Sequence, residues 1–320
     1  MSDLTLNNDN LIPQLGLGTW KSEPGQVATA VKEALKVGYR HIDCAPVYGN
    51  EKEVGQGLKA SLANNIVKRE DIFITSKLWN NQHAQGDVVP ALKQTLADLQ
   101  LEYLDLFLIH WPIAFKKEVS WATKPEEFIP LSELPLIETW QGMEKAVNEG
   151  LVKNIGVSNF SQAKLENLCL NAQIQPCMNQ VECHPYLQQD ELLAYCQEKG
   201  IRLTAYSPLG SKDRTDSLRQ KDEPILLENS AIKQIAQKHQ GTPAQILLKW
   251  AIERGTVVIP KSVSPQRIKE NFEAQNVPLD SEDMKQIANL NNDYRYVDGS
   301  FFAVPNSGYT VENIWDIPKV

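Results

Sequence analysis

The chain alternates between two hydrophobic patterns over most of its length. Stretches with apolar residues three or four positions apart indicate helices, and short runs of adjacent apolar residues indicate strands covered on both faces. In the first such stretch Val27, Val31 and Leu35 share one face, and Gly38 ends the pattern. The pattern predicts helices over Gly25–Val37, Asn50–Ala63, Asp87–Leu99, Ile137–Glu149, Ser161–Asn171, Gln188–Lys199, Pro243–Glu253 and Pro265–Glu273. It predicts strands over Leu15–Gly18, His41–Asp43, Ile72–Ser76, Leu104–Ile109, Ile155–Val157, Met178–Val181, Leu203–Ala205 and Val257–Ile259.

Eight strands that alternate with helices favour a (β/α)8 barrel, or TIM barrel, of the α/β class, and a single such domain accounts for residues 1–320. The alternative is an open doubly wound sheet. That fold usually carries a GxGxxG motif after its first strand, and Gly16-Leu17-Gly18 does not complete one. Thr5-Leu6 and Leu11-Ile12 flank four polar residues and predict an N-terminal β-hairpin. Two long excursions, 113–136 and 210–229, follow strands and are expected to overhang the active site of a barrel.

Polar residues stand at or just after the ends of three predicted strands. Asp43 and Tyr48 occur in HIDCAPVYG, Lys77 in DIFITSKLW and His110 in DLFLIHWP. Taken alone, Tyr48 would be interpreted as a loop tyrosine and His110 as a core histidine. Because the carboxyl ends of barrel strands meet at one face, the four side chains together favour one assembled site, and hence an enzyme.

These four residue types suit the chemistry of a carbonyl group. A phenol has a pKa near ~10 and is a poor acid at neutral pH, but an adjacent ammonium stabilises the phenolate. Lys77 is therefore expected to lower the pKa of Tyr48 and make it a usable proton donor, with Asp43 keeping Lys77 charged. A neutral His110 can donate to the same substrate oxygen. Such a site stabilises a developing alkoxide and protonates it, which is the polar half of a carbonyl reduction; a hydride donor is still required.

A basic loop and a helix follow the last predicted strand, in the sequence IPKSVSPQRIKEN. Pro265 falls in the first turn of that helix, and Lys261, Ser262 and Arg267 lie near its N-terminus. A helix N-terminus with such neighbours binds phosphate, although basic residues near helix ends are also common on solvated surfaces. The position after the last barrel strand, where phosphate sites recur, favours the phosphate site.

Composition narrows the class of protein. The net charge is −8 and the pI is about 5.3, which argues against nucleic acid or an acidic membrane as a partner. The five cysteines are odd in number and form no CxxC pair, so neither a disulfide framework nor a zinc site is indicated, and no metal is expected. The N-terminal sequence does not resemble a signal peptide, and no apolar run approaches the ~18 residues of a membrane span. A cytoplasmic protein is expected.

Eight motifs occur in order along the chain: GLGTWKS, GYRHIDCAPVYGNE, TSKLW, LIHWP, GVSNF, NQVECHPY, AYSPLG and IPKSVSPQRIKEN. With these motifs the chain resembles the aldo-keto reductases, and in particular the aldose and aldehyde reductases. The resemblance extends from about Leu4 to Asn271. It implies a (β/α)8 barrel that binds NADPH without a Rossmann domain, acts on a small-molecule carbonyl substrate and is usually a monomer. It also implies that Tyr48 is the general acid, supported by Asp43, Lys77 and His110.

The resemblance further implies a set of cofactor-binding residues. Ser158, Asn159 and Gln180 are expected to hold the nicotinamide carboxamide, and Tyr206 to stack on the nicotinamide ring. The remaining expected contacts are Ser207, Leu209 and Ser211 along the pyrophosphate, and Lys261, Ser262, Arg267, Glu270 and Asn271 at the adenosine 2′-phosphate and adenine. Thr19, Trp20, Asp43 and Val263 complete the expected cofactor-binding set. This set favours NADP over NAD.

The substrate side is expected to be an apolar bowl above the nicotinamide. Its predicted residues, besides Tyr48 and His110, are Trp20, Val47, Trp79, Trp111 and Phe115. The tail after Asn291 differs from the expected aldose reductase tail, which closes over the pocket and sets specificity in the family. Phe301, Phe302 and Tyr309 are therefore candidates either for substrate contact or for packing on the barrel.

The function favoured by these observations is the NADPH-dependent reduction of aldehydes, with aldoses and small ketones as further candidate substrates, to alcohols. Two alternatives stay open: a polyol or hydroxysteroid dehydrogenase that works in the oxidative direction, and an NADPH-sensing regulatory protein with slow turnover. The complete set of Asp, Tyr, Lys and His argues against a pure sensor, because a sensor needs the cofactor loop but not the acid.

Overall fold

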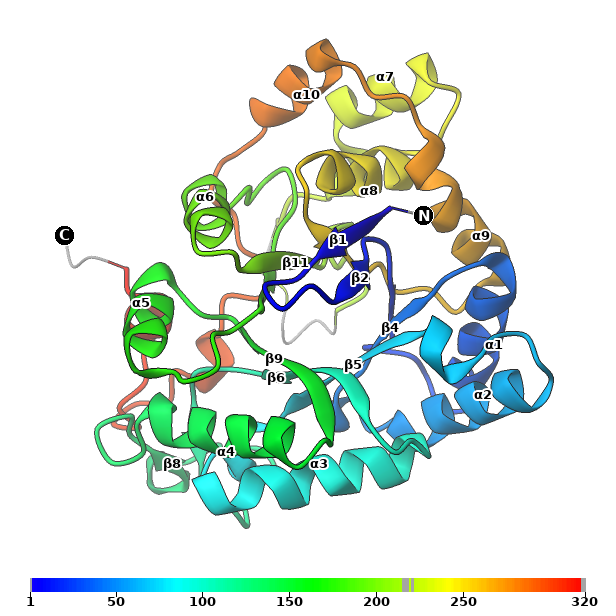
Figure 1. Cartoon of the computed structure of the whole chain (residues 1–320). Helices are drawn as coiled ribbons and strands as arrows, with labels where there is room; N and C mark the ends of the chain where they lie inside the picture. Colours follow the sequence, from blue (N-terminus) through cyan, green and yellow to red (C-terminus); the bar gives the residue numbers. More distant parts are fainter. Residues whose placement is uncertain (1, 215–218, 220–221, 318–320) are drawn as a thin grey trace.

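Parallel strands form the centre of the molecule (Figure 1). In the computed structural model, which describes residues 2–214, 219 and 222–317, they pair in the order β12, β11, β10, β9, β6, β5, β4, β3. Their bounds are β3 (Leu17–Gly18), β4 (His41–Asp43), β5 (Phe73–Leu78), β6 (Leu104–Ile109), β9 (Val152–Ser158), β10 (Met178–Glu182), β11 (Arg202–Tyr206) and β12 (Val257–Val258). Each prediction of a strand is confirmed, with bounds that differ by a few residues at most.

The first and last strands close the sheet into a barrel. The backbone nitrogen of Gly16 donates to the Val258 carbonyl oxygen (2.9 Å), and that of Gly18 donates to the Pro260 carbonyl oxygen (3.0 Å). The closure leaves no room for a side chain at Gly18, where a Cβ atom would lie 2.8 Å from the Ile259 carbonyl oxygen. The predicted (β/α)8 barrel is confirmed.

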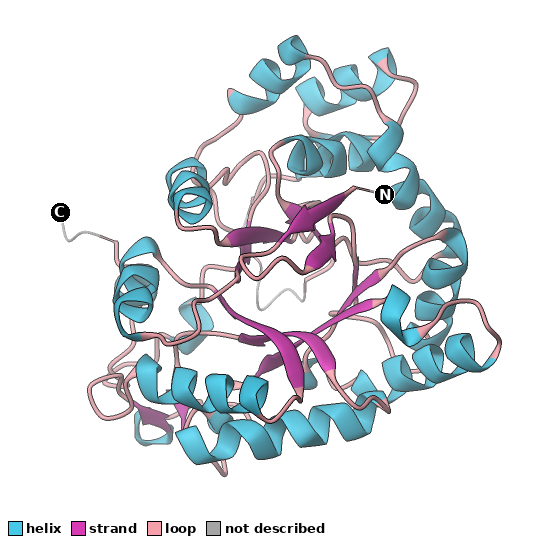
Figure 2. Cartoon of the chain, in the orientation of Figure 1, coloured by secondary structure: helices cyan, strands magenta, loops and turns pink. Residues whose placement is uncertain are grey.

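Helices surround the strands, as Figure 2 shows by colour. The predicted helices are present as α1 (Val27–Val37), α2 (Glu51–Ala63), α3 (Gln85–Leu99), α4 (Leu136–Asn148), α5 (Gln162–Asn171), α6 (Asp190–Glu198), α8 (Pro243–Glu253) and α9 (Pro265–Glu273). In the part of the chain that the structure describes, three further helices were not predicted: α7 (Ser230–Lys238), α10 (Ser281–Ala288) and α11 (Val311–Trp315). Helix α11 has five residues, too few for the apolar period to repeat, and α10 buries one apolar residue, Ile287. Helix α7 is as long as α6 and buries Ile232, Ile235 and Ala236 at helical spacing, so its signal is present in the sequence.

Strand β6 shows why the barrel strands are apolar on both faces. Leu106 and Leu108 belong to the buried cluster inside the barrel, whereas Phe107 and Ile109 belong to the cluster between the strands and the helices. Side chains alternate between the two faces of a strand, so both sets need apolar residues.

The predicted N-terminal hairpin covers the amino ends of the barrel strands. Strands β1 (Asp3–Thr5) and β2 (Leu11–Pro13) pair antiparallel, with Leu4 opposite Ile12. Ile12 is buried in the same interior cluster as Phe73, the first residue of β5. The hairpin therefore closes one end of the barrel and leaves the carboxyl ends of the strands for a site.

The two excursions and the tail lie at the other end. The first excursion contains a small hairpin of β7 (Ala114–Phe115) and β8 (Phe128–Ile129), and the second contains a 3₁₀ turn, η6 (Leu226–Glu228). Part of the second excursion, residues 215–218, 220 and 221, lies outside the described residues. The helices among the described residues are too short or too polar to cross a membrane.

Candidate active site

A cavity of about 1090 Å³ lies at the carboxyl ends of the barrel strands. Its wall includes most residues predicted for the site: Thr19, Trp20, Asp43, Val47, Tyr48, Trp79, His110, Trp111, Ser158, Asn159, Gln180, Tyr206, Ser207, Leu209, Ser211, Lys261, Ser262, Val263, Arg267, Glu270 and Asn271. These residues are scattered from position 19 to position 271, and the barrel brings them to one face.

Three of the four predicted catalytic side chains form a hydrogen-bonded chain. Lys77 in β5 donates from Nζ to Asp43 Oδ1 at the end of β4 (2.5 Å) and lies 3.3 Å from Tyr48 Oη. Lys77 Nζ also donates to the Cys44 carbonyl oxygen (2.9 Å), and its side chain is fully buried behind the cavity wall. The ion pair fixes the ammonium beneath the Tyr48 hydroxyl, as the sequence predicted.

The pKa of Tyr48 moves in the direction opposite to the prediction. Burial raises it to about 12, and the charge of Lys77 is the largest influence that opposes this rise. Burial also disfavours the charged form of Lys77, but Asp43 and Tyr48 outweigh it and raise the pKa of that ammonium above its usual value. Tyr48 therefore carries its proton at neutral pH, next to a permanent positive charge.

His110 follows β6 and lies against the same phenol. Its ring is 5.8 Å from that of Tyr48 in an edge-on arrangement and 5.2 Å from that of Trp79. Burial, with Lys77 nearby, lowers the pKa of His110 well below its ordinary value, so the imidazole is neutral. Among the described residues its Nδ1 atom has no hydrogen-bond partner. A neutral imidazole of this kind can donate one hydrogen bond to a ligand in the cavity.

A buried network of amides lies beside the catalytic chain. Gln180 Nε2 donates to Asp43 Oδ2 (2.8 Å), which ties β10 to the ion pair. Asn159 Nδ2 donates to the His110 carbonyl oxygen (2.9 Å), and Tyr206 Oη donates to Asn159 Oδ1 (2.8 Å). Asn159 has a φ of 62°, a backbone conformation that few residues other than glycine adopt. The network places amide groups and the Tyr206 ring at the cavity wall.

The other end of the cavity is basic. Lys21, Arg214, Lys261 and Arg267 contribute to its wall, and Asp213 pairs with Lys21 and lies 3.6 Å from Lys261 Nζ. Helix α9 begins here, with the Ser264 hydroxyl accepting from the backbone nitrogen of Arg267 (3.4 Å) and Pro265 in the first turn. A capped helix N-terminus and several cations suit a phosphate group.

The end near Tyr48 is aromatic and includes the tail. Trp111 contacts Phe301 and Phe302 edge-on, with ring centroids 5.8 and 5.3 Å apart. Trp121, from the first excursion, stacks between Trp79 (5.7 Å) and Phe301 (5.8 Å). All of these rings line the cavity, so the tail and the first excursion complete the aromatic wall.

The structure corrects the prediction for Phe115 as a pocket residue. Its ring in β7 is buried against Trp79, Phe128 and Phe302 and is not part of the cavity wall. The hairpin of β7 and β8 turns the side chain behind the aromatic residues that do line the cavity. Tyr309 also packs outside the cavity, where its hydroxyl donates to the Ile129 carbonyl oxygen (2.7 Å).

Several wall residues were not predicted. Lys21 lies next to Trp20 in the motif GLGTWKS, so its position in that motif was a usable signal. Arg214 and Tyr296 come from the second excursion and the tail, where no periodic pattern marked them. Their contribution depends on how those segments fold over the barrel.

Comparison with known proteins agrees with this geometry. Residues 14–292 match the model of the aldo/keto reductase family. The chain is 50% identical to aldo/keto reductase slr0942 of Synechocystis sp., over 99% of this chain and 97% of that protein. It is 49% identical to the rat protein named aldo-keto reductase family 1 member A1, over 92% and 91% of the two chains. The fold matches the structure of the aldose reductase of Schistosoma japonicum with a TM-score of 0.87 and 40% identity, over 95% and 96% of the two chains.

The carboxyl ends of the barrel strands thus bring together a tyrosine beside a buried lysine, a neutral histidine and a basic site that suits a phosphate group. This geometry occurs in a chain with extensive similarity in sequence and fold to known aldo/keto reductases. The chain belongs to the aldo/keto reductase family of oxidoreductases.

Proposed function

We propose that the protein is an NADPH-dependent reductase that converts aldehydes to alcohols, with Tyr48 as the general acid. The observation that carries the proposal is the chain from Asp43 through Lys77 to Tyr48, which reaches the cavity beside the neutral His110. Aldoses and small ketones are further candidate substrates.

The residues of the cavity fit NADPH, the reduced nicotinamide adenine dinucleotide phosphate. Asn159 and Gln180 carry amide groups at the wall near Tyr48, where a carboxamide would bind, and Tyr206 presents a ring beside them. At the opposite end Lys261 and Arg267 face the cavity, and Glu270 is held by the Thr242 hydroxyl (2.9 Å). This end supplies cations for a 2′-phosphate, which supports NADPH over NADH. When bound, NADPH supplies the hydride.

The protein's own residues then act on the carbonyl oxygen. As the carbonyl carbon gains a hydride, its oxygen becomes an alkoxide, and the Tyr48 hydroxyl transfers a proton to it. A pKa of about 12 keeps that proton in place until the alkoxide, a stronger base than a phenolate, develops. Lys77 stabilises the phenolate that remains, and His110 donates a hydrogen bond to the same oxygen.

The aromatic wall favours aldehyde substrates that carry an apolar group. Trp20, Trp79 and Trp111 flank the end of the cavity at which Tyr48 lies. They bind apolar substrate groups and exclude water, so the charge that develops on the carbonyl oxygen interacts with few competing solvent molecules.

The first test replaces Tyr48 with phenylalanine. A general acid contributes roughly 10²–10⁴-fold to the rate, so we expect kcat to fall by about that factor while NADPH still binds, as measured by quenching of tryptophan fluorescence. Tyr39→Phe is the matched control, because Tyr39 is a buried tyrosine whose hydroxyl donates to the Ile268 carbonyl oxygen (3.2 Å) away from the cavity. Near-normal turnover in Tyr48→Phe would contradict the proposed acid.

The second test identifies the cofactor and the substrate class. The protein is mixed with NADPH or NADH and with glyceraldehyde, xylose, benzaldehyde or a ketosteroid, and the loss of nicotinamide absorbance is followed. We expect turnover of the aldehydes with NADPH. Turnover of the corresponding alcohols with NADP⁺ alone would favour a dehydrogenase, and tight NADPH binding without turnover would favour a regulatory sensor.

A further inference from the structure

The C-terminal tail is attached to the barrel by a carboxylate that the proposed chemistry does not use. Glu182 is the last residue of β10, lies in the motif NQVECHPY and is fully buried. Its Oε1 atom accepts from the backbone nitrogen of Tyr296 (2.7 Å), and its Oε2 atom accepts from that of Val297 (2.7 Å). One side chain thus satisfies two consecutive backbone nitrogens of a segment more than a hundred residues away.

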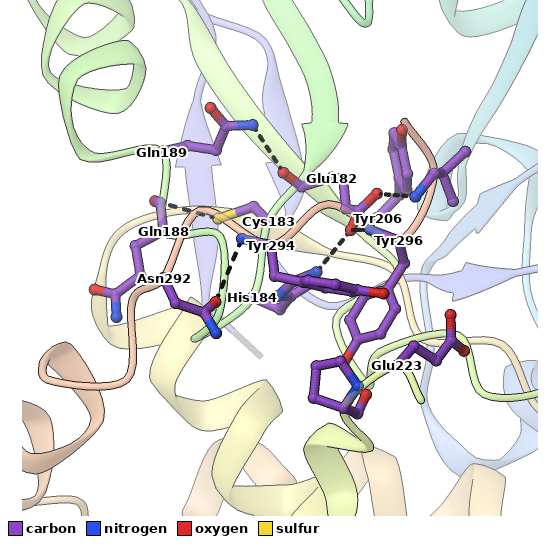
Figure 3. Close-up of polar contacts among 12 residues, drawn as sticks. Glu182, Cys183, His184, Gln188, Gln189, Tyr206, Glu223, Asn292, Tyr294 and Tyr296 are labelled. Carbon is purple, nitrogen blue, oxygen red and sulfur yellow. Dashed lines mark hydrogen bonds and ion pairs between the residues drawn. The ribbon is translucent and has the colours of Figure 1, made fainter. Parts of the chain in front are cut away.

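The surroundings of Glu182 keep this carboxylate ionised. His184 Nε2 lies 2.7 Å from Glu182 Oε1, and Figure 3 shows the carboxylate between this ring and the backbone of Tyr296. Burial alone would raise the pKa of Glu182, but His184, Arg295 and the backbone bond from Tyr296 outweigh it and lower the pKa. Charge-assisted hydrogen bonds to a buried carboxylate are among the stronger ones in proteins.

Tyr296 also joins the tail to the second excursion. Its hydroxyl donates to the Pro224 carbonyl oxygen (2.7 Å), and its carbonyl oxygen accepts from Arg214, which pairs with Glu223. Tyr296 and Arg214 both line the cavity. The residue that Glu182 holds is therefore the point at which barrel, tail and excursion meet.

The tail immediately after this point forms the substrate side of the cavity. Val297, Asp298, Ser300, Phe301 and Phe302 contribute to the wall. Gly299 has a φ of 80°, and a Cβ atom there would lie 3.3 Å from Trp111, so this turn is closely packed against the aromatic wall. Because Phe301 and Phe302 follow this turn and contact Trp111, a shift of residues 296 and 297 is expected to move them relative to Trp111.

We propose that Glu182, together with His184, is a positioning residue for substrate selection: it fixes the tail at Tyr296 and Val297 and so sets the place of Phe301 and Phe302 in the substrate wall. The role in substrate selection rests on the proposed reductase function. The attachment of the tail to Glu182 does not depend on that function. Glu182 does not contact the hydroxyl of Tyr48, so it acts on which aldehydes fit rather than on proton transfer.

The test replaces Glu182 with glutamine. Glutamine has nearly the same volume as glutamate, but its amide nitrogen replaces one of the two accepting oxygens. An amide nitrogen cannot accept a hydrogen bond from a backbone N–H, so one of the two bonds to the tail is lost. Hydrogen exchange of the peptide covering 294–302, measured by mass spectrometry, should become faster. We expect kcat/KM for benzaldehyde to fall roughly tenfold, which is the factor for one charge-assisted hydrogen bond, through KM more than kcat. For glyceraldehyde, which is too small to need the aromatic wall, the change should stay below about threefold. Because both aldehydes are reduced with the same cofactor, any effect on NADPH binding cancels in the ratio of their kcat/KM values.

Glu144→Gln is the matched control. Glu144 in α4 is also a buried carboxylate that accepts two consecutive backbone nitrogens, those of Gln173 (2.7 Å) and Ile174 (2.9 Å), but it lies away from the cavity. Both bonds end at one oxygen, Oε1, which the amide oxygen of glutamine can replace. Glu144→Gln should therefore leave exchange near residue 173 and the benzaldehyde to glyceraldehyde ratio nearly unchanged, and it shows what neutralising a buried carboxylate does by itself. Glu182→Asp, which keeps the charge, should give a smaller change in that ratio than Glu182→Gln and serves if the glutamine variant does not fold.

The outcomes separate the two proposals. Unchanged exchange of the tail in Glu182→Gln would overturn the attachment, and faster exchange with an unchanged substrate ratio would overturn the role in selection. Absence of aldehyde turnover in the wild-type protein would instead contradict the proposed function, while the exchange measurement would still test the attachment.

Discussion

Asparagine in place of Asp43 should destabilise the protein strongly although the side chain hardly changes shape. Lys77 is fully buried, and Asp43 Oδ1 at 2.5 Å is the carboxylate that balances its charge. The Cys44 carbonyl oxygen and the Tyr48 hydroxyl remain as partners of Nζ, but neither carries a counter-charge. Removing one member of a buried ion pair costs about 3–5 kcal/mol, so the free energy of unfolding at pH 7 should fall by that amount.

The pH dependence of stability gives a second, independent signature of this pair. In the wild-type protein the pKa of Lys77 is raised above its unfolded value, so the ammonium is protonated in both states between pH 7 and 9 and contributes no slope there. Without Asp43, burial lowers that pKa, and the folded state then binds one proton fewer than the unfolded state. The stability of the variant should rise with pH by as much as about 1.4 kcal/mol per pH unit.

Urea unfolding followed by tryptophan fluorescence at pH 7, 8 and 9 measures both quantities. The control is Glu149→Gln, which breaks an exposed pair with Lys93 (3.3 Å) and should cost less than about 1 kcal/mol with no added slope. A loss below about 1 kcal/mol in Asp43→Asn, with the same pH dependence as the wild type, would refute the reasoning about the buried pair.

Two further predictions concern the cofactor and a second buried carboxyl group. Arg267→Ala should weaken NADPH binding by about 10- to 100-fold and leave NADH binding nearly unchanged, because we propose that its guanidinium pairs with the 2′-phosphate, which NADH lacks. Fluorescence titration with both cofactors measures this, and equal weakening of both would contradict the assignment. Burial raises the pKa of Glu51 to about 7, although hydrogen bonds from Ser76 and Thr95 act to lower it. Between pH 4.5 and 7 the folded state therefore holds a proton that the unfolded state releases. The resulting stabilisation is fully present below pH 4.5, and about 3 kcal/mol of it is lost as the pH rises to 7. Glu51→Gln should lack this loss, so its stability relative to the wild type should increase between pH 5 and pH 8 in urea unfolding; parallel pH profiles would disprove it.

Much of the fold was predictable from the sequence because its signals are local. The apolar period of each helix and the continuous apolar runs of the strands depend on neighbouring residues, and they identified the eight barrel strands and the helices α1 to α6, α8 and α9. The placement of polar residues after strands predicted that Asp43, Tyr48 and His110 meet, because parallel strands of a barrel end at one face. The five-residue helix α11 offered too few repeats to be recognised.

Other properties depend on contacts between distant segments and were decided only by the tertiary structure. The charge of Lys77 alone suggested a lowered pKa for Tyr48, but the packed barrel removes water from the phenol and reverses the direction. Phe115 lies in an excursion that follows a barrel strand, yet the small hairpin turns it behind Trp79. Glu182 and the backbone of Val297 are 115 positions apart, so no local pattern relates them. The sequence determined which elements form and which chemical groups reach the site, whereas burial and long-range packing determined the charge states of those groups and the shape of the substrate wall.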